Sequence, residues 1–170
     1  MDNYEAQAEQ IRNEFCTLRD TMQNDPKYTE AHKTATLKAE REKALEKMTE
    51  LRKANNAEKV AKTQSLANTV FERKGSELEY LNIMKNVETM NAASLEKFID
   101  SAVSINADEV LRAIGRSAFN REDLYTLQLL RDKTSGNISK GVGSILDHLL
   151  DMRDAKSKFA NSMAFTLPGF

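Results

Sequence analysis

Apolar residues recur at alternating steps of four and three along the first 22 residues of the chain. Nearly every residue between them is polar or charged. Side chains with this spacing form one stripe along a helix, and the pattern is typical of a coiled-coil seam. It predicts a helix from about Asn3 to Gln23 whose apolar face packs against another helix. The stripe consists of Tyr4, Ala8, Ile11, Phe15, Leu18 and Met22.

A second, longer helix is expected from Lys27 to Lys74. Pro26 fits the first turn of a helix better than its interior, and residues 27–74 contain neither Gly nor Pro. The apolar stripe of this segment is interrupted at Asn55 and Asn56, which predicts partial exposure or a kink there. Before the interruption the stripe consists of Leu37, Ala44, Met48 and Leu51, and it continues imperfectly with Val60, Ala67 and Phe71.

Shorter helices are predicted in the rest of the chain. Gly75 is a helix stop, and Ser76 with Glu79 forms a capping box, so a third helix should run to about Met90. Three short helices should follow, the second of which ends at Gly115. Their expected caps are Ser94, Asn106 with Glu109, and Asn120 with Asp123. The last helix follows Gly136 and carries an apolar stripe of Ile138, Val142, Ile145, Leu149, Met152, Phe159 and Met163.

The predicted fold is therefore all-α, with a long N-terminal coiled-coil helical hairpin followed by a small C-terminal helical bundle. Residues 1–75 form the coiled-coil arm, residues 76–94 the connecting helix and join, and residues 95–170 the bundle with an apolar C-terminal tail. Strong helix formers fill most of the 170 residues, and only six Gly and two Pro interrupt them.

Charge is distributed unevenly along the chain. Residues 1–25 carry a net charge of −4 and residues 27–75 a net charge of +5. An acidic first helix folded back on a basic second helix is electrostatically matched, which favours an antiparallel hairpin. Nucleic-acid binding by the basic helix is the alternative, but it is not favoured, because acidic residues interleave with the basic ones and aromatic residues are few.

The sequence offers no catalytic, metal or cofactor site. His32 and His148 are the only histidines and Cys16 is the only cysteine, so no nucleophile with its base and no closed zinc site can be assembled. The best acidic cluster is Asp147, Asp151 and Asp154 beside His148, which fits a solvated helix face better than an ion site. Gly136 and Gly141 have the spacing of a phosphate loop, but Val142 and Gly143 stand where Lys and Ser or Thr are needed. These glycines are interpreted as a flexible entry to the last helix.

The C-terminal segment from Ala164 to Phe170 is apolar, and Pro168 prevents it from continuing as a helix. Two docking sites stay open for it, its own bundle or a neighbouring protein. The predicted partner interface consists of Ile11, Phe15, Leu18, Met22, Phe165, Leu167 and Phe170. No apolar run approaches the roughly 20 residues of a membrane span, and the acidic N-terminus is not a signal peptide, so a cytoplasmic protein is expected.

In its overall texture the chain resembles the helical scaffolding, internal-core and connector proteins of tailed bacteriophages, which are similarly charged and poor in Cys and Trp. The resemblance extends over the whole chain and rests on no specific motif. It implies a structural protein that forms homo-oligomers or binds a helical partner on a larger shell, and that enters a virion. The alternatives are a helical adaptor or inhibitor of a host protein, and a nucleic-acid-binding protein.

Overall fold

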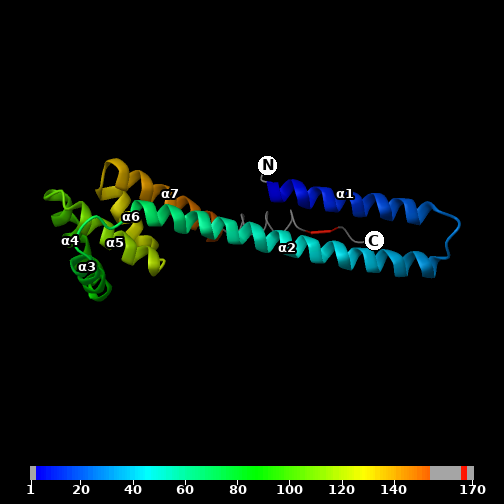
Figure 1. Ribbon diagram of the computed structural model, residues 1–170, viewed down its shortest axis with the longest axis horizontal. Helices are drawn as coiled ribbons and strands as arrows, with labels where there is room; N and C mark the ends of the chain where they lie inside the picture. The colour runs from blue at the N-terminus through cyan, green and yellow to red at the C-terminus, as the bar shows by residue number, and fades with distance from the viewer. Residues whose placement is uncertain (1–2, 154–165, 168–170) are drawn as a thin grey trace. The chain divides into compact units, whose positions relative to one another are not determined.

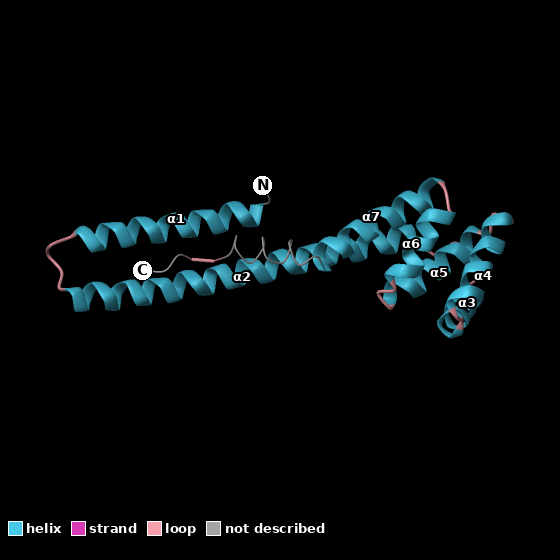
Figure 2. Ribbon diagram, turned by 180° about the vertical axis from the view of Figure 1, so that it is seen from behind, coloured by secondary structure: helices cyan, strands magenta, loops and turns pink. Residues whose placement is uncertain are grey.

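The computed structural model describes residues 3–153 and 166–167, and all regular structure in these ranges is helical. Figures 1 and 2 show the helices, and the predicted all-α class is confirmed for this part of the chain. In the same ranges, no helix combines the length and the apolar character of a bilayer span. Within the described residues the helices are α1 (Asn3–Asn24), α2 (Glu30–Val70), α3 (Glu77–Thr89), α4 (Ala92–Ser104), α5 (Asp108–Asn120), α6 (Leu124–Lys133) and α7 (Gly136–Arg153).

The described residues fall into two compact units, and α2 contributes to both. Unit 1 comprises residues 3–59, 153 and 166–167, and unit 2 comprises Val60–Met152. These boundaries differ from the predicted segments 1–75, 76–94 and 95–170. The end of α2 and all of α3 belong to unit 2, because Phe71 and Val87 are buried in its core. The division into an arm, a join and a bundle as separate domains stays a prediction.

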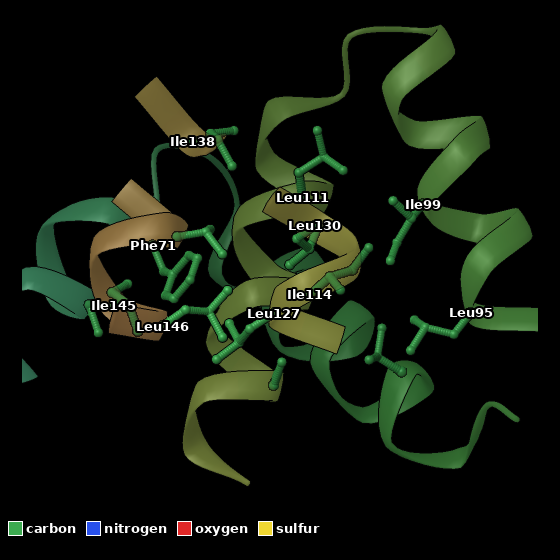
Figure 3. Packing of buried hydrophobic residues seen from close by; sticks show 14 of the residues in the cluster. Phe71, Leu95, Ile99, Leu111, Ile114, Leu127, Leu130, Ile138, Ile145 and Leu146 are labelled. Atoms are coloured by element: carbon green, nitrogen blue, oxygen red, sulfur yellow. The ribbon is translucent and has the colours of Figure 1, made fainter. Parts of the chain in front are cut away.

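The core of unit 2 is made of one apolar face from each of its helices (Figure 3). Its α7 members include Ile138, Val142, Ile145 and Leu149, which lie on the apolar stripe that the sequence predicts for the last helix. The buried members are Ala67, Phe71, Val87, Leu95, Ile99, Ala102, Leu111, Ile114, Ala118, Leu127, Leu130, Ile138, Val142, Ile145, Leu146 and Leu149.

The first two caps of unit 2 show where local signals suffice and where they do not. The Glu79 amide donates a hydrogen bond to Ser76 Oγ at 3.5 Å, and α3 begins directly after Ser76, as predicted. The predicted cap of α4 is wrong by one turn. The Ser94 amide donates to Asn91 Oδ1 at 2.9 Å, so Asn91 is the cap and Ser94 lies inside the helix. Both residue types cap helices, and spacing alone did not distinguish them.

The predicted caps of α5 and α6 also need correction. Helix α5 begins after Ala107 without a side-chain cap, and Asn106 has a positive φ of 52°. Asparagine tolerates this left-handed conformation better than most residues, which explains its place in the turn. Helix α6 is capped by Asp123, whose carboxylate accepts a hydrogen bond from the Thr126 amide at 3.1 Å. Asn120 is the last residue of α5 and caps nothing.

Two glycines mark close helix contacts, where the sequence predicted a helix end and a flexible entry. Helix α5 continues through Gly115, where a Cβ atom would lie 2.1 Å from Phe71 Cε1. Helix α7 contains Gly141, where a Cβ atom would lie 2.4 Å from Val70 Cγ2. Both positions therefore need glycine because α5 and α7 pack closely on the end of α2. Gly136, by contrast, has a positive φ of 63° and begins α7 at the predicted position.

Polar contacts hold the segment between α2 and α3. The Glu109 carboxylate accepts hydrogen bonds from the backbone amides of Lys74 and Gly75, at 3.0 and 3.1 Å. The Tyr80 hydroxyl donates to the Phe71 carbonyl at 2.7 Å. Burial of this hydroxyl raises the pKa of Tyr80 above its ordinary value, because the ionised form would lose its hydration. Glu109 thus contacts a loop far away in the sequence, whereas the sequence predicted a role in the capping box of its own helix.

Candidate protein-interaction groove on unit 1

Helix α1 buries the stripe that its sequence predicts. Ala8 and Phe15 are 0% and 3% exposed, and they pack against Ala44 and Met48 of α2. The other four stripe residues, Tyr4, Ile11, Leu18 and Met22, are half-buried. Figures 1 and 2 show α1 beside the first part of α2, after a short loop. The stripe of α1 therefore meets a helix of the same chain, and coiled-coil geometry of the pair stays a prediction.

The loop between the two helices is longer than predicted. Helix α2 begins at Glu30, three residues after the predicted start, and it ends at Val70, before the predicted Lys74. The His32 amide donates to Thr29 Oγ1 at 3.3 Å, so Thr29 satisfies an amide that has no partner within the first turn. Pro26 lies in the turn before this cap and not in the first turn of the helix.

A buried lysine connects the first turn of α2 to the end of α1. Lys33 is 8% exposed, and its Nζ atom donates to the Gln23 carbonyl at 3.1 Å. The same ammonium group forms an ion pair with Glu30 at 2.9 Å. A cation at a helix C-terminus is favourable because the last carbonyl groups carry partial negative charge. Lys33 therefore holds α1 and α2 together at the loop end of the pair.

Asn55 does not interrupt α2, which continues as a helix on both sides of it. Asn55 is 4% exposed and lies on the buried face, whereas Val60, predicted to resume the stripe, is 57% exposed. Thr63 is buried instead of Val60, and Ala67 and Phe71 are buried as predicted. Helical position thus decided which residues are buried along α2, and it overrode the polarity of Asn55.

Two adjoining hollows form an open groove along one side of the contact between α1 and α2, and we call them together the groove. The first has a volume of about 130 Å³ and the second about 310 Å³. Ile11 and Lys47 line both hollows and connect them. The described residues around the first are Ile11, Glu14, Phe15, Leu18, Glu40, Lys43, Ala44 and Lys47. Those around the second are Gln7, Ile11, Lys47, Glu50, Leu51 and Ala54.

The groove combines an apolar floor with a charged rim. Ile11, Leu18 and Leu51 are each only half-buried, so part of their apolar surface is left uncovered by α1 and α2. On the rim, Lys43 forms an ion pair with Glu40 at 2.7 Å. The Lys43 ammonium group donates a hydrogen bond to this carboxylate, which raises the pKa of Lys43 above its ordinary value, so that Lys43 stays charged at neutral pH. This arrangement suits contact with another amphipathic helix, which buries apolar surface in the centre and pairs charges at the edges.

Leu167 packs in the apolar contact between α1 and α2. It is 8% exposed and belongs to the cluster that contains Ala8, Phe15 and Met48. The adjacent Thr166 carbonyl accepts a hydrogen bond from Arg12 Nε at 3.2 Å. Leu167 packs against α1 and α2 within unit 1, and not against the C-terminal bundle, which was one of the two docking sites left open.

The predicted interface residues do not all line the groove. Ile11, Phe15 and Leu18 line the groove, whereas Met22 is half-buried beyond it. Leu167 belongs to the buried cluster that also contains Phe15, and Phe165 and Phe170 lie outside the described residues. The α2 side of the groove was missed as an interface, although Leu51 had been assigned to the α2 stripe. The missed residues are Glu40, Lys43, Ala44, Lys47, Glu50, Leu51 and Ala54.

The residues weighed for catalysis and metal binding lie apart from the groove lining. Asp147, His148 and Asp151 are exposed on α7, and Asp154 lies outside the described residues. Over residues 3–153 and 166–167, no group of three or more His, Cys, Asp or Glu side chains has an arrangement that could hold a metal ion. Cys16 is half-buried beside the seam residue Phe15.

Comparisons with protein-family models, with curated proteins and with solved structures find no match to this chain. The functional argument therefore rests on the groove and its residues.

Proposed function

We propose that this chain is a non-enzymatic structural or assembly protein, which binds other helices through the groove on unit 1. One observation carries the proposal. The stripe of α1 is covered unevenly: Phe15 is 3% exposed, whereas its neighbours Ile11 and Leu18 keep uncovered apolar surface in the groove. A stripe with this pattern is complete only when a further helix lies over it.

The remaining apolar surface is large enough to matter for binding. Full burial of a Leu or Ile side chain is worth about 1.5 to 3 kcal/mol, so covering the exposed part of Ile11, Leu18 and Leu51 would contribute roughly 1 kcal/mol each. This is a modest sum for one site.

Two alternative functions are a helical adaptor or inhibitor and a nucleic-acid-binding protein. A helical adaptor or inhibitor of a host protein would place a foreign helix in the groove. Binding of nucleic acid by α2 has less support, because Lys33 and Lys43 already form ion pairs with Glu30 and Glu40. Residence in the cytoplasm and entry into a larger shell, such as a virion, belong to the same proposal of an assembly role.

A matched pair of substitutions tests the proposal. Leu18→Glu puts a charge in the groove, whereas Asn13→Glu adds the same charge on the exposed opposite face of α1. Leu18 lies outside the buried cluster of unit 1, so its variant should keep wild-type helical content by circular dichroism. The particle that contains the protein in extracts of its source cells should become smaller with Leu18→Glu and stay unchanged with Asn13→Glu. Equal particle sizes for both folded variants and the wild type would contradict an assembly role for the groove.

A further inference from the structure

We propose that the occupant of the groove is the same groove of a second copy of this chain. Two unit 1 helix pairs would pack face to face around a twofold axis, with α1 of each copy lying over α2 of the other. This inference rests on the proposed function and names its partner. An interface of this kind is isologous, so it closes after two copies and leaves no unpaired groove.

The charges of the two helices favour this pairing. Helix α1 carries four acidic and two basic residues, whereas residues 30–59 of α2 carry six acidic and eight basic residues. On the rim of the groove, Glu14 belongs to α1, and Lys43 and Lys47 belong to α2. Placing α1 over α1 would bring like charges together, whereas α1 over α2 sets Glu14 of each copy against the lysines of the other. Complementary charges of this kind select both the partner and its orientation.

The size of the face is sufficient for a specific dimer. At 1.5 Å per residue, α1 is about 33 Å long, and two adjacent helices are about 20 Å wide. The groove side of the pair therefore offers roughly 650 Å² per copy, or about 1,300 Å² in total, which lies within the range of standard interfaces. Four helices packed in this way form a bundle in which Ile11, Leu18 and Leu51 are all covered.

Charge reversal on the rim provides the test. Glu14→Lys and Lys47→Glu should each weaken self-association of the purified full chain, by about threefold to thirtyfold, because each variant loses two equivalent pairs per dimer. Sedimentation equilibrium from about 1 to 500 µM would give the association constants, and circular dichroism would confirm that both variants are folded. Asn13→Glu is the control and should associate as the wild type does.

Mixing the two variants separates contacts between copies from contacts within one copy. In an equimolar mixture, Glu14 of one variant can meet Lys47 of the other, and the reversed pair also has opposite signs. The mixture should therefore associate within about threefold of the wild type, whereas the pairs within each chain are unchanged by mixing. A wild type that is monomeric throughout this range, single variants that associate normally, or a mixture that shows no recovery would overturn the proposal.

The self-association measured by sedimentation is independent of the particle size measured in cell extracts. A chain that is monomeric when purified, but whose native particle is lost with Leu18→Glu, refutes the second copy as the occupant and retains the assembly role. A purified dimer that Leu18→Glu abolishes, together with an unchanged native particle, supports the dimer and refutes the assembly role.

Discussion

Replacing Gly115 by Ala should destabilise unit 2, although alanine is the better helix former. Gly115 lies inside α5, and the added methyl carbon would be 2.1 Å from Cε1, 2.6 Å from Cδ1 and 2.8 Å from Cζ of Phe71. Phe71 is 1% exposed, so its ring has no open space into which it can move. The substitution therefore sets a steric cost against a gain in helix propensity.

The relative size of the steric cost and the propensity gain determines whether Gly115→Ala destabilises the protein. Overpacking a filled core costs about 1 to 3 kcal/mol, and three ring atoms inside contact distance place this site in the upper part of that range. Replacing Gly by Ala within a helix gains at most about 1 kcal/mol. We expect a net loss of about 1 to 2 kcal/mol in the free energy of unfolding. For a unit of about 100 residues, each kcal/mol lowers the melting temperature by about 4 to 8 °C.

Chemical and thermal unfolding followed by circular dichroism would measure the loss, with Gly143→Ala as the matched control. Gly143 also lies in a helix, but its added Cβ atom would be an ordinary 3.6 Å from Arg131 Cδ. Gly143→Ala should therefore be neutral or stabilising by up to about 1 kcal/mol. In the Phe71→Leu background, which shortens the opposing side chain, the cost of Gly115→Ala should fall by about 1 kcal/mol or more.

The reasoning would be refuted by a Gly115→Ala variant that is as stable as the wild type, or more stable. It would also be refuted if the cost were the same in the Phe71→Leu background. Equal losses in both backgrounds would mean that the ring of Phe71 is not what excludes a side chain from position 115.

Two further predictions concern the other contacts of the fold. Tyr80→Phe leaves the Phe71 carbonyl without its donor and should cost about 1 to 3 kcal/mol at neutral pH. Because the pKa of Tyr80 is raised in the folded state, the contribution of Tyr80 to stability is complete below the ordinary pKa of about 10 and is lost as the pH rises through the folded value. Unfolding measured across alkaline pH should therefore show a steeper loss of stability in the wild type than in Tyr80→Phe. Identical pH profiles for the two proteins would contradict this expectation. Leu167→Ala should lower the stability of unit 1 by about 2 kcal/mol, since Leu167 is buried against α1 and α2. Hydrogen exchange should then become faster at the α1 amides and stay unchanged in α5, and unchanged protection of α1 would show that Leu167 does not hold it.

Local sequence signals determined the helical class, most helix positions and most buried faces. The spacing of Ala8, Ile11 and Phe15 defined the face of α1 that packs on α2, and Ser76 marked the start of α3. These features depend on residues within one or two turns of each other. Periodicity and capping act over that distance, so they can be recognised without knowledge of the fold.

Part of the candidate site could also be predicted in this way. Ile11, Phe15 and Leu18 were predicted as interface residues, and all three line the groove. The α2 side, with Lys47 and Leu51, was missed because the stripe of α2 is weaker and is interrupted by polar residues. A periodic pattern shows which face of a helix is buried, but it does not show how much of that face the neighbouring helix leaves open.

Only the tertiary structure decided the contacts between distant segments. Gly115 has the sequence signal of a helix end, yet its role comes from Phe71, which packs against it from the end of α2. Leu167 has the signal of an apolar tail, yet its contact is with α1 and α2 at the other end of the chain. Such contacts depend on which surfaces meet when the helices pack. Side-chain volume and available space at that point are set by both partners, so neither local segment contains the information by itself.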